Sequence, residues 1–147
     1  MSFVNVLGIL VWLLACAISD WKTRRVPNVW VYGFGLVAAL VLVLTRHALG
    51  GAGWQQGLLG FGMATLLTLP GFVLGRLGGG DVKLLMGLGL ATDARTVAVT
   101  FVVATLALLV GAVWHRLKVG ARDGLSREWP FVPCLLAGYV VTLAMGS

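Results

Sequence analysis

The sequence predicts an all-α membrane protein, a polytopic helical bundle of six transmembrane segments with a short fourth segment. Of its 147 residues, 59% are hydrophobic and 11% are charged, whereas soluble domains carry about 25% charged residues. The apolar runs are continuous, whereas a transmembrane β-barrel needs alternating strands of about ten residues. The polar connections leave no room for a soluble domain, so we expect residues 1–147 to form a single integral membrane domain.

Turn and capping signals divide the chain into helices. Pro27 disfavours the α conformation at the preceding residue, so a turn separates the first two helices. Pro70 is expected to kink the third helix, and Thr92-Asp93 has the composition of an N-cap. The fourth segment would be only about 15 Å long as a helix, so it crosses by tilting or in a thinned bilayer. The predicted helices cover residues 3–19, 29–44, 57–75, 82–91, 94–114 and 130–145.

The connections between the predicted helices and the glycine pattern say less about function. Residues 45–56 are expected to form a surface loop, and residues 115–128 a basic loop. Gly71 and Gly75 form a G-x-x-x-G pair, which is typical of close helix packing in membranes.

The formal net charge of +6 is arranged to orient the chain in a membrane. If the short segment crosses, only Arg46 and Arg95 face outward, both chain ends lie outside, and the other cations face the cytoplasm. These cytoplasmic cations predict contact with anionic lipid headgroups at the inner membrane, and not with nucleic acid. They are Lys22, Arg24, Arg25, Arg76, Lys83, Arg116, Lys118, Arg122 and Arg127.

The two cysteines, Cys16 and Cys134, lie inside apolar runs and form no C-x-x-C pair. They are interpreted as buried small hydrophobic residues, and no metal site or cofactor is expected.

The predicted topology brings Asp20 and Asp81 to the same cytoplasmic boundary. Two close carboxylates in a partly dehydrated site share a proton, so one can activate water while the other donates to a peptide carbonyl. Helix dipoles favour Asp81 as the base and Asp20 as the acid, whereas the cations beside Asp20 favour the reverse. A structural interpretation also exists: Asp81 caps the following helix, and Asp20 is an ordinary charge in a cationic flank.

Three motifs carry a resemblance to a known family. Residues 78–81 read G-G-G-D and fit G-x-G-D, residues 20–28 fit D-x-x-x-R-x-I-P-N with Val26 in place of isoleucine, and residues 130–133 read P-F-V-P. In this order along the chain, they resemble the type IV prepilin peptidases.

The resemblance implies a membrane-embedded aspartic endopeptidase that removes the basic leader from prepilin-like precursors at the cytoplasmic boundary. Asp20 and Asp81 would be its catalytic residues. Longer members carry paired C-x-x-C motifs linked to N-methylation; this chain lacks them, so it is similar to the short Flp pilus subgroup without methyltransferase activity. Six further residues belong to these motifs or lie beside the aspartates in the sequence. We expect them to bind substrate or to shape the site: Gly78, Gly80, Lys83, Arg24, Pro27 and Asn28.

Three other functions stay open from the residues. A small ion- or proton-coupled transporter or channel subunit would use the two aspartates as ion sites. A presenilin-like protease would place them deeper in its helices, and a structural subunit would not need them.

Overall fold

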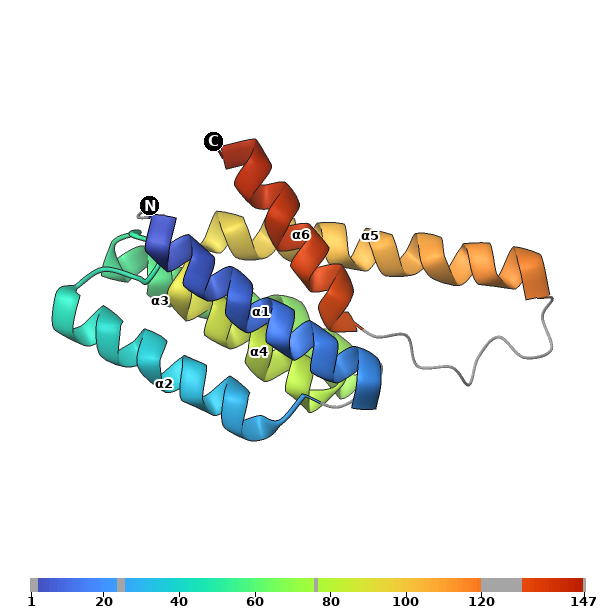
Figure 1. Ribbon diagram of the computed structural model, residues 1–147, viewed down its shortest axis with the longest axis horizontal. Helices are drawn as coiled ribbons and strands as arrows, with labels where there is room; N and C mark the ends of the chain where they lie inside the picture. The colour runs from blue at the N-terminus through green and yellow to red at the C-terminus, as the bar shows by residue number, and fades with distance from the viewer. Residues whose placement is uncertain (1–2, 24–25, 76, 120–130, 147) are drawn as a thin grey trace.

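The computed structural model describes residues 3–23, 26–75, 77–119 and 131–146, which form helices joined by short turns (Figure 1). Within these ranges the only β-pairing is an isolated bridge between His47 and Gly53. The prediction of an all-α fold is therefore confirmed. The helices are α1 (Phe3–Thr23), α2 (Asn28–Thr45), α3 (Trp54–Val73), α4 (Gly79–Ala91), α5 (Ala94–Val119) and α6 (Phe131–Gly146).

Four of these helices, α1, α2, α3 and α5, are long and apolar enough to cross a membrane. The apolar stretch of α6 is shorter, and α4 has 13 residues, which corresponds to about 20 Å of helix. The chain is therefore a multi-pass membrane protein. Crossing by α4 and α6, which the six-segment topology requires, stays a prediction.

Two helices continue past their predicted ends. The first was expected to stop at residue 19 and the fifth at residue 114, but α1 runs to Thr23 and α5 to Val119. Polar residues begin at these points, yet neither glycine nor proline interrupts the backbone there. Loss of hydrophobicity marks where a helix leaves the hydrocarbon, not where it ends. Asp20 consequently lies within a helix, and residues 115–119 are helical instead of part of a loop.

The third helix is shifted relative to its prediction. α3 begins at Trp54 and ends at Val73, with Pro70 inside it. Gly75 has a φ of +66°, a backbone conformation that glycine adopts at little cost. Gly75 lies beyond the helix, so the prediction that Gly71 and Gly75 form a G-x-x-x-G motif for helix packing is wrong.

The short helix α4 lies inside the bundle. It packs against α2 and α3, while α5 packs against α3 and α6, and α6 against α1. Leu84, Leu85 and Leu88 of α4 are fully buried. α3 and α4 approach so closely that a Cβ at Gly60 or Gly89 would meet the backbone of the other helix. Small residues at such crossings are typical of helix packing in membranes.

The loop between α2 and α3 also contacts α4. Ala48 and Gly50 are buried, and the N–H of Gly50 donates a hydrogen bond to the carbonyl of Ala91 at 2.6 Å. The expectation that residues 45–56 form only a surface loop is wrong, because this loop covers the carboxyl end of α4. At the next turn, Asp93 accepts a 2.8 Å hydrogen bond from the N–H of Thr96, so the predicted N-cap of α5 is confirmed.

Each helix from α2 to α5 runs roughly opposite to the helix before it, as Figure 1 shows. As a result, the carboxyl ends of α1, α3 and α5 lie toward the same end of the bundle as the amino ends of α2, α4 and α6. This end carries Asp20 and Asp81.

Candidate active site

Asp20 lies near the carboxyl end of α1 but takes its hydrogen-bond partner from α6. Only 7% of its surface is exposed. Its Oδ2 accepts a hydrogen bond from the backbone N–H of Val132 at 3.1 Å. Val132 is the second residue of α6, and the first N–H groups of a helix have no partner within that helix. Asp20 therefore joins the end of α1 to the start of α6.

Asp81 lies in the first turn of α4 and is supported by the glycines before it. Gly78 is the N-cap residue, Gly79 and Gly80 are the first two helical residues, and Asp81 is the third. The backbone N–H of Gly78 donates a hydrogen bond to the Asp81 carboxylate. A side chain at the third helical position that reaches back to the N-cap amide is a known stabilising arrangement. Asp81 thus supports the start of α4, as the structural interpretation anticipated.

The absence of a side chain at residue 78 leaves space for this carboxylate. A Cβ at Gly78 would lie 3.2 Å from Oδ2 of Asp81, which is closer than ordinary van der Waals contact. A Cβ at Gly80 would meet nothing within 4 Å. The two glycines of the G-x-G-D motif therefore differ: Gly78 makes room for the Asp81 side chain, whereas Gly80 faces open space.

The two carboxylates interact electrostatically. Asp81 is half-buried and lies outside the four candidate membrane spans. Burial, and then the negative charge of Asp20, raise the pKa of Asp81 to about 6, although the hydrogen bond from Gly78 opposes the shift. A carboxyl group with a pKa in this range exchanges protons readily near neutral pH, as a general acid or base must.

Lys83 points away from the pair. Its Nζ lies over the ring of Tyr32 in α2, 4.8 Å from the ring centre. Because successive helical residues are about 100° apart, Lys83 and Asp81 project from different sides of α4. This cation–π contact joins α4 to α2.

The other predicted site residues lie at the start of α2. Pro27 is the N-cap of α2, and its carbonyl accepts the N–H of Trp30 at 3.0 Å. Asn28 is the first helical residue, and both residues are exposed. Arg24, which was also predicted to shape the site, lies outside the described residues.

The site includes two residues of α6 that were not among the predicted site residues. Val132 supplies its backbone N–H to Asp20, and the thiol of Cys134 lies within electrostatic reach of the same carboxylate. The P-F-V-P motif was a signal for this region, but it did not reveal that a main-chain group would bind Asp20. Cys16 is buried, as predicted, whereas Cys134 is only half-buried.

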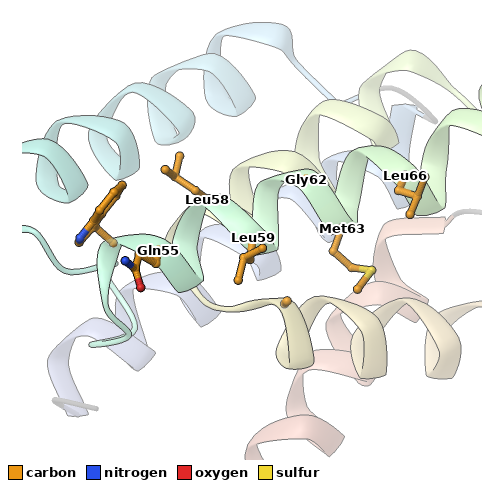
Figure 2. A pocket seen from close by; sticks show the side chains of 8 residues that line it. Gln55, Leu58, Leu59, Gly62, Met63 and Leu66 are labelled. Atoms are coloured by element: carbon orange, nitrogen blue, oxygen red, sulfur yellow. The ribbon is translucent and has the colours of Figure 1, made fainter.

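An apolar pocket lies elsewhere on the bundle. It is an open depression of about 610 Å³; its lining residues are Trp54, Gln55, Leu58, Leu59, Gly62, Met63 and Leu66 of α3, with Ala94 of α5. Figure 2 shows the α3 side chains along it. Its lining is apolar except for the Gln55 amide and the indole N–H of Trp54. This pocket lies along the amino-terminal part of α3, whereas Asp81 follows the other end of that helix. In the part of the chain that the structure describes, no group of three or more His, Cys, Asp or Glu residues could hold a metal ion.

The fold and the site define a class of protein: a multi-pass helical membrane protein with two interacting carboxylates at one end of its bundle. The model of the type IV leader peptidase family matches residues 7–114, a range that includes both aspartates, and the chain belongs to this family.

The chain is also similar to a prepilin leader peptidase/N-methyltransferase of Bacillus subtilis (strain 168). The two sequences are 26% identical over 139 residues, which cover 92% of this chain and 53% of the relative. The chain therefore spans about half the length of this curated relative. No solved structure matches it.

Proposed function

We propose that this chain is a membrane-embedded aspartic endopeptidase that removes the basic leader from prepilin-like precursors. Asp20 and Asp81 are its catalytic pair. The observation that carries the proposal is the interaction of these two carboxylates, from helices far apart in sequence, at one end of the bundle. Membership of the leader peptidase family supports the reaction class.

The pair would act by general acid–base catalysis. The ionised carboxylate accepts a proton from a water molecule while the water oxygen attacks the carbonyl carbon of the scissile peptide bond. The protonated carboxyl group donates its proton to the carbonyl oxygen, giving a tetrahedral intermediate. When the C–N bond breaks, the carboxyl group that took a proton from water gives it to the leaving amine. The other carboxylate takes back its proton from a hydroxyl of the tetrahedral intermediate, so the elements of water are divided between the two products and the pair returns to its starting state.

We assign the shared proton of the resting pair to Asp81. Burial and the charge of Asp20 raise the pKa of Asp81 to about 6. Asp20 accepts the N–H of Val132, and a donor of this kind favours an ionised acceptor. This assignment is the reverse of the one favoured by the α1 and α4 dipoles, because the start of α6 supplies a second helix N-terminus beside Asp20.

The site would face the cytoplasm from the inner membrane. Lys22 lies near the carboxyl end of α1 and Lys83 near the amino end of α4, as the two aspartates do, whereas Arg46 follows the carboxyl end of α2 and Arg95 is the second residue of α5. Cations are enriched on the cytoplasmic side of membrane proteins. In this orientation, the amino end of α1 and the carboxyl end of α6 lie outside the cytoplasm. The cytoplasmic cations then lie beside anionic lipid headgroups.

We further propose that these 147 residues cleave the leader without methylating the product. Their two cysteines cannot supply the paired C-x-x-C motifs that the resemblance associates with methyl transfer. A prepilin of the Flp type is the expected substrate, because the resemblance is to that short-form subgroup.

The test is cleavage of a co-expressed Flp-type prepilin by the wild type, Asp20→Asn and Asp81→Asn. Asp93→Asn is the matched control, because asparagine caps a helix as well as aspartate does. We expect each of the first two variants to lose at least about 100-fold in cleavage rate at normal membrane levels, while the control cleaves normally. Cleavage retained by Asp20→Asn or Asp81→Asn would refute the mechanism, and ion flux would then be measured instead.

A further inference from the structure

Asp20 occupies a position that its own helix disfavours. It lies in the last part of α1, where the exposed carbonyl groups give the helix end a partial negative charge. A carboxylate there is destabilised unless another element compensates. The compensating partner is the N–H of Val132, 3.1 Å from Oδ2.

The bond between Asp20 and Val132 is protected from water. The side chain of Val132 is fully buried, and Asp20 is nearly so. A hydrogen bond from an N–H to a carboxylate is stronger than one between neutral groups, and a low local dielectric strengthens it further. The start of α6 therefore fixes one carboxylate oxygen in place.

The sequence of α6 suits this role. Pro133 follows Val132 and has no N–H, so the first turn of α6 offers no competing donor at that position. Proline is tolerated in the first turn because its N–H would have no partner within the helix. The donor to Asp20 is the main-chain N–H of residue 132, so this hydrogen bond does not require a particular side chain at that residue.

We infer that the first turn of α6 is a positioning element for the catalytic pair, acting through the backbone N–H of Val132 on Asp20. This inference rests on the proposed function. With Oδ2 held by α6, the other oxygen, Oδ1, remains for water and for the proton shared with Asp81. Among the described residues, the titratable groups that other helices bring near Asp20 are Asp81 of α4 and Cys134 of α6.

The direct test replaces the amide at residue 132 by an ester, using the α-hydroxy analogue of valine, which removes the N–H and keeps the side chain. The matched control is the same replacement at Val140, whose N–H lies within the α6 helix. We expect the ester at 132 to lower kcat for prepilin cleavage by about 10- to 100-fold, since a hydrogen bond to a charged group is lost. KM should change by no more than about 3-fold, because substrate binding does not use this N–H.

A pH profile separates positioning from a general structural effect. Without the donor, the ionised form of the pair is less favoured, so the acidic limb of the rate profile moves up by about 0.5 to 1 pH unit. The ester at Val140 should leave this limb in place. If the ester at 132 gives insufficient protein, Val132→Pro removes the N–H and Val132→Ala keeps it, and the same differences are expected between these two variants.

Equal kcat values and equal pH profiles for the esters at 132 and 140 would overturn the positioning role, while inactive Asp20→Asn would leave the proposed function standing. If Asp20→Asn cleaves prepilin normally, the proposed function and this inference both fail.

Discussion

Asp20 and Asp81 are held in similar ways although they come from different helices. Each accepts a hydrogen bond from a main-chain N–H at the start of a helix: Val132 of α6 for Asp20, and Gly78 before α4 for Asp81. These donors favour negative charge, whereas burial and mutual repulsion oppose it. The balance leaves Asp81 with a pKa of about 6, so the pair retains a proton much closer to neutral pH than an isolated aspartate would.

Retaining this carboxylate costs stability, which gives a first prediction. The rise in the pKa of Asp81 from 3.8 to about 6 corresponds to about 1 to 3 kcal/mol for a half-buried group that ionises at neutral pH. Asp81→Asn removes the charge and keeps a hydrogen-bond acceptor. At pH 8 in detergent, we therefore expect this variant to be inactive and to unfold at a temperature several degrees above that of the wild type.

The sign of the pH dependence provides the control for that prediction. Because the folded-state pKa is raised, the wild type gains stability relative to Asp81→Asn as the pH falls through about 6. The difference in melting temperature should be largest above pH 6 and should narrow toward pH 4. A difference that widens as the pH falls would show that the ionised Asp81 stabilises the fold.

Gly78 provides a second prediction at the residue scale. A Cβ there would crowd Oδ2 of Asp81 at 3.2 Å, whereas a Cβ at Gly35 of α2 would meet nothing within 4 Å. Gly78→Ala should displace the carboxylate by a few tenths of an ångström and lower the cleavage rate by about tenfold. Gly35→Ala, assayed in parallel at equal membrane levels, should retain wild-type activity. Equal rates for the two variants would show that Gly78 does not position Asp81.

At the scale of the elements, the apolar runs located the six helices that the described residues form, but their ends were harder to predict. Hydropathy reports the boundary of the hydrocarbon, so it could not show that α1 continues through Asp20 to Thr23. The fourth helix was predicted to begin at residue 82, yet Gly79 and Gly80 are helical because α4 is buried among its neighbours. Tertiary packing overrode the low helix propensity of glycine there.

The close crossing of α3 and α4 gives a third prediction, which belongs to these two elements. A Cβ at Gly89 would overlap the backbone of Gly60, so Gly89→Ala forces the helices apart. We expect it to lower the free energy of unfolding by about 1 to 3 kcal/mol, as overpacking does. Gly62→Ala, on the same helix as Gly60 but with open space around it, is the control and should be neutral or slightly stabilising. Equal thermal stability of the two variants would argue against a tight α3–α4 contact.

At the scale of the whole molecule, the topology explains why part of the site was predictable. Alternating helix directions and the placement of the cations were enough to predict that Asp20 and Asp81 lie at the same end of the bundle. The carboxyl end of α1 and the amino end of α4, which carry these residues, do lie at one end. The contribution of α6 could not be predicted in the same way. It is made by the N–H of Val132, a group that every residue except proline carries, so no residue type at that position identifies it.

The pH dependence of kcat/KM for prepilin cleavage between pH 4 and pH 9 tests whether Asp20 and Asp81 share one proton. Activity requires one ionised and one protonated carboxyl group, so the profile should be bell-shaped. The alkaline limb should be centred at or above about pH 6, where Asp81 loses the proton. A rate that rises with pH to a plateau and shows no alkaline limb up to pH 9 would contradict a proton shared by the catalytic pair.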